Sequence, residues 1–141
     1  MPTSISIDAS VAIKTIVEER FSDLARKLIA ENDLILAPAH AYAEITEIIY
    51  RKHIAGDIDE KQALMAIERL PRILTLVPLD AIMADAFRIA KEIRHSVYDC
   101  LYVAAALKCG TTLVTADTKL VLKCRGTRLS ETVRELATVF S

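Results

Sequence analysis

Three aspartates occupy positions where a parallel sheet would gather carboxylates. Asp8 directly follows the apolar run SISI, Asp117 stands two residues after TLVT, and Asp99 precedes the uncharged stretch CLYVAAAL. If the two runs are neighbouring parallel strands, Asp8 and Asp117 share one edge of the sheet. A helix running antiparallel to the second strand would begin near the same edge and bring Asp99 alongside. Because like charges packed together repel, this arrangement predicts a bound cation.

A fourth carboxylate follows from helical periodicity in PAHAYAEITEIIYRKH. The apolar stripe of this predicted helix consists of Ala41, Tyr42, Ile45, Ile48 and Ile49. Glu44 lies at the flank of the stripe, whereas Glu47 lies far round the helix and is expected to face solvent. Because the helix follows the run LILA, with Pro38 near its first position, Glu44 lies within two turns of the same sheet edge.

Each of these residues also has a purely structural explanation. Asp8 and Asp117 could be N-caps of the helices that follow them, and Ser96-x-x-Asp99 has the pattern of a capping box. Glu44 could be an ordinary boundary glutamate. Their convergence favours chemistry, because four carboxylates without a histidine or cysteine cluster suit a hard cation such as Mg²⁺. One or two such ions can activate water and stabilise the oxygens of a phosphoryl displacement.

The elements that position these side chains alternate along the chain. The predicted strands are 4–7, 34–37, 73–77, 112–115 and 127–130. The predicted helices are 10–31 (broken near Glu18–Arg20), 39–55, 59–70, 80–94, 97–109, 118–124 and 131–139. This alternation, with strands that are almost wholly apolar, predicts a parallel sheet covered by helices on both faces.

The composition agrees with a single domain over residues 1–141, a length that buries about two thirds of the unfolded chain's surface. The hydrophobic share of 52% fits a fully covered sheet or an apolar association surface. The net charge of -1 argues against a surface that is basic throughout for nucleic-acid binding. The three cysteines form no CxxC pair, which indicates reduced thiols. With no signal-peptide or membrane-span pattern, we expect a cytoplasmic protein without a membrane partner.

The motifs IDASVAIK, AEI, SVYDCLYVAAALKCG and TLVTAD, in that order, resemble those of the PIN-domain ribonucleases, above all the VapC-type toxins of prokaryotic toxin–antitoxin pairs. The resemblance runs from the first strand to at least Asp117. It implies a three-layer α/β/α sandwich around a parallel five-stranded sheet, usually as a homodimer. It also implies a Mg²⁺- or Mn²⁺-dependent endoribonuclease acting on structured RNA such as tRNA or rRNA. A small antitoxin, whose tail fills the acidic cleft, is the implied protein partner.

By position, the resemblance assigns metal binding and catalysis to an acidic quartet and orientation of carboxylates or waters to two hydroxyl residues. The quartet is Asp8, Glu44, Asp99 and Asp117, and the hydroxyl residues are Ser10 and Thr115. We hypothesise that the metal lowers the pKa of a bound water. In-line attack by that water would leave a 5′-phosphate and a 3′-hydroxyl, without a histidine base and without the RNA 2′-OH.

Other residues could contact substrate or a partner. Lys14, one or two turns after Asp8, could reach a substrate phosphate or could simply be solvated. Tyr98 could stack on a base or pack in the core. The aliphatic segment LMAIERLPRIL could be a dimer or antitoxin surface, or plain core. The three histidines lack the spacing of zinc ligands, so zinc is not expected.

Two other classes of function stay open at the level of sequence. A haloacid-dehalogenase-type phosphatase needs a second Asp where Ser10 stands, and a receiver-like phosphoacceptor needs a Lys after a late strand, where Asp117 comes first. The non-enzymatic alternative is a PIN-like scaffold that binds RNA or protein without cutting. The presence of all four acids argues against the scaffold, because their mutual repulsion would serve no purpose there.

Overall fold

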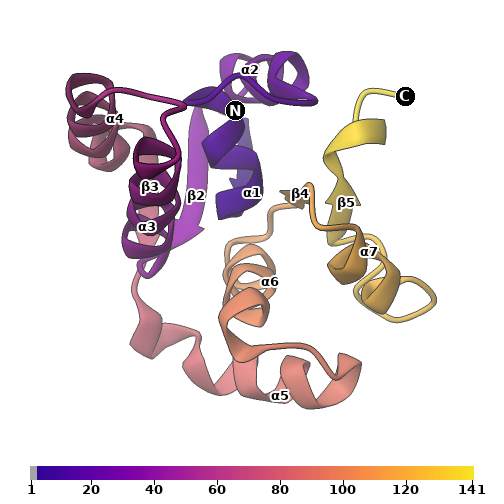
Figure 1. Cartoon of the computed structure of the whole chain (residues 1–141). Coiled ribbons are helices and arrows are strands. Elements are labelled where there is room, and N and C mark those ends of the chain that lie inside the picture. Colours follow the sequence, from indigo (N-terminus) through magenta and orange to yellow (C-terminus); the bar gives the residue numbers. More distant parts are fainter. Residues whose placement is uncertain (1–2) are drawn as a thin grey trace.

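Five short parallel strands form one sheet in the order β3-β2-β1-β4-β5. The computed structural model describes residues 3–141 (Figure 1). The strands are β1 (Ser4–Ile7), β2 (Leu34–Pro38), β3 (Leu74–Val77), β4 (Leu113–Thr115) and β5 (Val133–Glu135). The α-helices are α1 (Ala9–Ala12), α2 (Ser22–Ala30), α3 (Ala41–Ile54), α4 (Glu60–Ile73), α5 (Met83–Ile93), α6 (Val97–Cys109) and α7 (Thr118–Cys124). Single 3-10 turns are η1 (Ile13–Thr15), η2 (Leu79–Ala81) and η3 (Leu136–Thr138).

The strand order reverses direction once, between β1 and β4. The chain steps from β1 to β2 to β3 on one side and then returns across the sheet to β4 and β5. With right-handed crossovers, α1 to α4 cover one face and α5 to α7 cover the other. The predicted α/β/α sandwich is therefore confirmed, and its switch point lies where β1 and β4 end, the usual place for a ligand in such sheets.

Helix α6 is the buried centre of its layer. Its residues from Cys100 to Ala106 are all buried, and the helix contacts β1, β2 and β4, with α5 packed over it. This burial confirms the expectation drawn from its uncharged sequence, and the 13 residues of α6 end at Gly110, whose φ of 66° provides a left-handed cap. Within residues 3–141, no helix is both long enough and apolar enough to cross a bilayer.

The first four predicted strands are confirmed, but the fifth is wrong. Residues 127–130 form turns, in which the Thr127 hydroxyl donates to the Cys124 carbonyl at 2.6 Å and Leu129 is fully buried. The alternating pattern there comes from a turn that inserts one leucine into the core. The strand lies at Val133–Glu135 instead, paired in parallel with β4, so the predicted terminal helix over 131–139 is also wrong. Pairing with the sheet overrides the local preference of this segment.

Of two further predicted boundaries, one differs from expectation and the other is confirmed. Pro38 ends β2 rather than beginning the next helix, and its register partner is Val77 at the end of β3. The predicted break in the first helical region is confirmed, because Phe21 adopts φ 69° and separates η1 from α2. Pro38 lies where the chain leaves β2, and Phe21 lies at the start of α2, the helix that leads back to the sheet.

Helix α3 offers a direct test of the core assignment. Ile45 is 1% exposed on the buried face of α3, whereas Glu47 is exposed. We expect Ile45→Ala to lower the free energy of unfolding by about 2–5 kcal/mol, because it leaves a cavity. Glu47→Ala, the matched control on the same helix, should change it by less than about 0.5 kcal/mol. Urea denaturation measures both, and equal effects would contradict the packing described.

Candidate metal centre

The register of β1 and β4 brings the first carboxylate and its partners together. Ile7 pairs with Val114, so the next residues, Asp8 and Thr115, stand side by side at the strand ends. The Thr115 hydroxyl donates to Oδ2 of Asp8. The Ser10 hydroxyl donates to Oδ1 at 2.5 Å, and the Val11 N–H reaches the same oxygen at 3.3 Å. Asp8 is thus an N-cap, as one of the two explanations from sequence proposed.

The same two hydroxyls also hold the loop that carries the next aspartate. The Ala116 N–H donates to Oγ of Ser10 at 2.9 Å, and the Asp117 N–H donates to Oγ1 of Thr115 at 3.0 Å. Each hydroxyl donates to Asp8 and accepts from the β4–α7 loop. Ser10 and Thr115 therefore sit where residues that orient carboxylates are expected, while their part in catalysis stays a prediction.

The charged form of Asp8 is disfavoured where it stands. Burial raises the pKa of Asp8 to about 6, an effect that the hydrogen bonds from Ser10, Thr115 and Val11 oppose and that the charge of Asp99 adds to. A carboxyl group in this state gains most from a nearby cation, which would favour its ionised form.

Glu44 approaches from α3 and is anchored by α6. The Tyr102 hydroxyl, on a side chain that is 2% exposed, donates to Oε1 of Glu44 at 3.3 Å. Burial raises the pKa of Glu44, and the charges of Asp99 and then Asp8 add to that rise. Glu47 points to solvent, where it pairs with Arg51, so the preference for Glu44 over Glu47 at the sheet edge agrees with the geometry.

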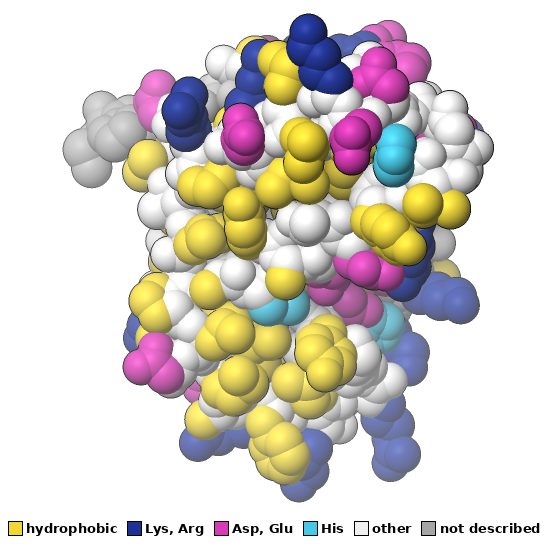
Figure 2. Space-filling model, turned by 60° about the vertical axis from the view of Figure 1, so that its left-hand side comes forward, with side chains coloured by type: hydrophobic (Ala, Val, Ile, Leu, Met, Phe, Trp, Pro, Cys, Tyr) yellow, Lys and Arg dark blue, Asp and Glu magenta, His cyan; other side chains and the backbone are white. Residues whose placement is uncertain are grey.

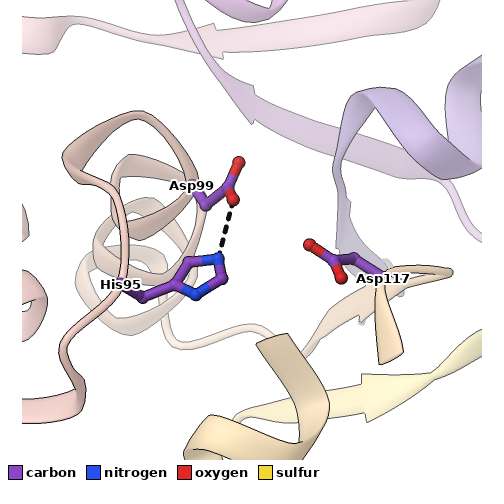
Figure 3. Close-up of side chains that lie close together, drawn as sticks. All are labelled: His95, Asp99 and Asp117. Atoms are coloured by element: carbon purple, nitrogen blue, oxygen red, sulfur yellow. Dashed lines mark hydrogen bonds and ion pairs between the residues drawn. The ribbon is translucent and has the colours of Figure 1, made fainter. Parts of the chain in front are cut away.

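Asp99 and Asp117 face each other across the mouth of the site (Figure 3). Oδ1 of Asp117 caps α7 by accepting the N–H groups of Lys119 at 3.0 Å and Leu120 at 3.4 Å. Capping uses only this oxygen, so it is compatible with a role in metal binding. Ser96 caps α6 by accepting the Asp99 N–H at 3.2 Å, but the Asp99 carboxylate does not complete the predicted capping box.

That carboxylate instead binds a histidine that sequence reasoning did not place at the site. Nε2 of His95 lies 2.7 Å from Oδ2 of Asp99, and His95, Asp99 and Asp117 each offer one atom within 4.8 Å of the others. The sequence indicated no histidine or cysteine cluster beside the carboxylates, and this single histidine was not predicted. The one sequence signal is that HSVYD and HAYAE both place a histidine four residues before a site acid.

The second of these histidines, His40, links α3 to α6. Its Nε2 lies 3.1 Å from the Tyr98 carbonyl and must donate, since a carbonyl only accepts. The same nitrogen is 3.7 Å from Oε2 of Glu44, and the ring packs against Tyr102 at 4.8 Å between centroids. Burial lowers the pKa of His40, which favours its neutral form.

The donor set fits a hard divalent cation. Among the ion pairs of residues 3–141, no Lys or Arg pairs with any of the four carboxylates. The set comprises Asp8, Glu44, Asp99 and Asp117: Asp99 lies close to Asp117, and its charge acts on Asp8 and Glu44. Mg²⁺ is usually held by one or two carboxylates together with retained waters, so the four need not all touch the ion.

Lys14 and Tyr98, the two candidates for substrate contact, differ in accessibility. The Lys14 ammonium lies 3.2 Å from Glu19 with the side chain only 11% exposed, so the expectation of a solvated lysine was wrong. Glu19 also binds Lys52 at 3.5 Å. Tyr98 is 70% exposed, which excludes core packing for its ring. Contact of either residue with substrate stays a prediction.

Comparison with known proteins agrees with this geometry. The family model described as PIN domain matches residues 5–125. Ribonuclease VapC1 of Mycobacterium tuberculosis (strain CDC 1551 / Oshkosh) is 26% identical over 119 residues, covering 81% of this chain and 86% of its own. The crystal structure of PAE2754 from Pyrobaculum aerophilum superposes with a TM-score of 0.65 at 21% identity, covering 97% and 86% of the two chains. A toxin–antitoxin complex from Klebsiella pneumoniae gives a TM-score of 0.62 at 15% identity, covering 94% and 97%. At these identities the two structures support the fold, and the family match confirms the resemblance predicted from sequence.

The raised pKa of Asp8 predicts a pH-dependent gain in stability on its removal. Because the folded-state pKa of about 6 exceeds the ordinary 3.8, the folded protein loses stability as pH rises through this window. Asp8→Asn should therefore be more stable than the parent at pH 7.5 in EDTA, by as much as about 3 kcal/mol at about 1.4 kcal/mol per pKa unit. The difference should vanish near pH 4. Urea unfolding at both pH values measures it, and a difference independent of pH would contradict the assignment.

Proposed function

Because this chain belongs to the PIN domain family, we propose that it is a divalent-metal-dependent endoribonuclease, the toxin of a prokaryotic toxin–antitoxin pair. The observation that carries the proposal is the convergence of Asp8, Glu44, Asp99 and Asp117 at the switch point of the sheet, where no lysine or arginine among residues 3–141 pairs with any of them. The relative named ribonuclease VapC1 supports the reaction class. The proposed cofactor is Mg²⁺ or Mn²⁺, for which this all-oxygen acidic set is suited.

In this proposal some residues bind the cation and others hold the carboxylates in place. A divalent cation, when bound, supplies a water of lowered pKa and stabilises the oxygens of the phosphoryl displacement. Asp8 and Asp117, which follow β1 and β4, and Asp99 in the first turn of α6 would hold the cation. Ser10 and Thr115 fix the orientation of Asp8.

The proposed reaction is hydrolysis of a phosphodiester bond. Water attacks the phosphorus in line with the leaving 3′-oxygen, the bond between phosphorus and that oxygen breaks, and the 3′-oxygen takes up a proton. The products are a 5′-phosphate and a 3′-hydroxyl. Glu44, whose pKa is raised, can accept the proton released by the attacking water. Tyr98, exposed beside His40, is placed to stack on a base of the substrate.

Partners belong to the same proposal. A solved toxin–antitoxin complex shares this fold, which supports a small antitoxin as the protein partner. On α4, Leu64, Met65 and Ile73 are exposed, and this helix lines a groove of about 270 Å³, as expected if LMAIERLPRIL is an association surface. Figure 2 shows hydrophobic side chains gathered over this side of the molecule, with acidic and histidine side chains among them. A homodimer and a cytoplasmic location stay predictions.

RNA cleavage by the purified protein tests the proposal. With Mg²⁺ or Mn²⁺ we expect discrete fragments of tRNA or rRNA, and EDTA should abolish them. Asp99→Asn should slow cleavage by at least about 100-fold, because loss of a residue that only supports a metal ligand already costs about 10- to 100-fold. Glu47→Gln, a carboxylate removed from the far side of α3, should cut at the wild-type rate. Metal-independent cutting, or equal loss in both variants, would contradict the proposal.

The chemistry of attack is tested with modified RNA. Because the nucleophile is water, a 2′-O-methyl group at the cleaved position should leave cutting intact, and the new ends should carry a 5′-phosphate and a 3′-hydroxyl. End-labelling with kinase, before and after phosphatase treatment, reads these ends. A 2′,3′-cyclic phosphate would show that the RNA 2′-OH attacks instead, and this version of the mechanism would then be abandoned.

A further inference from the structure

The three-residue link between α5 and α6, residues 94–96, is held by hydrogen bonds on both sides of the His95 side chain. Arg94 ends α5 in the left-handed conformation, with φ 54° and ψ 56°. Its carbonyl accepts from Nζ of Lys123 at 2.6 Å, and the His95 N–H donates to the Ala90 carbonyl at 3.3 Å. Ser96 follows directly as the N-cap of α6. A left-handed non-glycine residue costs about 1 kcal/mol or more and persists only where the surroundings impose it.

Within residues 3–141 the His95 imidazole makes one hydrogen bond, to Asp99. The His95 side chain is 14% exposed, and its Nε2 lies 2.7 Å from Oδ2 of Asp99. A carboxylate in its ionised form only accepts hydrogen bonds, so Nε2 carries the hydrogen and donates. Oδ1 of Asp99 receives no hydrogen bond from residues 3–141, and in Figure 3 the oxygen without a dashed line points away from the imidazole.

Each of the other carboxylates at the site also has its own neutral donor. The Ser10 and Thr115 hydroxyls donate to Asp8, and the Tyr102 hydroxyl donates to Glu44. Backbone N–H groups donate to Asp117. The Asp99 carboxylate receives no hydrogen bond from a hydroxyl or a backbone N–H among residues 3–141, and His95 is its donor. Outer partners of this kind set the orientation and basicity of the groups that bind a metal.

Building on the proposed function, we propose that His95 is a positioning residue of the metal centre. It holds Oδ2 of Asp99 through Nε2–H, which leaves Oδ1 free of hydrogen bonds from residues 3–141 and able to hold a cation. In this role the histidine acts as a hydrogen-bond donor and does not bind the metal. An imidazole that turned away from Asp99 to become a ligand would leave Oδ2 without its donor.

The test is Mn²⁺ affinity, measured by electron paramagnetic resonance of the free ion, without RNA. His95→Ala should weaken Mn²⁺ binding about 10- to 100-fold. His95→Gln should restore most of the affinity, because the side-chain amide of Gln retains an N–H donor. His53→Ala is the matched control: the one hydrogen bond of the His53 side chain within residues 3–141 is to the Ile58 carbonyl, so this variant should leave the affinity unchanged.

A measurement on the unaltered protein keeps the inference testable even if His95→Ala fails to fold. Pulsed resonance of the Mn²⁺-loaded wild type should show no nitrogen coupling of a directly bound imidazole. Such a coupling, or wild-type affinity in His95→Ala, would overturn the positioning role while leaving the proposed nuclease intact. Absence of Mn²⁺ binding by the wild type would overturn the proposed function and this inference together.

Discussion

Burial of carboxylates at one edge of the sheet, with repulsion between them added, is the constraint that governs this site. Burial raises the pKa values of Asp8 and Glu44, and the charge of Asp99 adds to each rise. Among residues 3–141, hydrogen bonds hold these groups in place, but no lysine or arginine pairs with any of the four carboxylates. The fold thus concentrates negative charge that a divalent cation would stabilise, and stability is given up for it in the absence of metal.

The sheet topology explains how so short a chain can concentrate this charge. Reversal of the strand order between β1 and β4 brings their carboxyl ends together at the switch point of the sheet, and the first turns of α3 and α6 carry Glu44 and Asp99 to the same edge. The hydroxyls of Ser10 and Thr115 then join the two strand ends into one unit. A change at either hydroxyl should therefore act on Asp8 and on the loop of Asp117 together.

Much of this arrangement was predictable from local pattern. Apolar runs gave four of the five strands, and acids at strand ends and helix starts indicated the site. The fifth strand was missed because Val133–Glu135 is a strand only through pairing with β4, while Leu129 mimicked a strand residue from within a turn. His95 was missed because it lies outside α6. The direction of its side chain depends on the left-handed conformation of Arg94, which no sequence pattern predicts.

Diffraction from crystals soaked in Mn²⁺, recorded for anomalous scattering, tests the central claim most directly. We expect a single strong region of anomalous density, of one ion or two adjacent ions, among Asp8, Asp99 and Asp117. Oδ1 of Asp99 should be directed at this density. Density lodged elsewhere, or a site still empty at millimolar Mn²⁺ near neutral pH, would contradict the claim that these carboxylates are gathered to hold a metal.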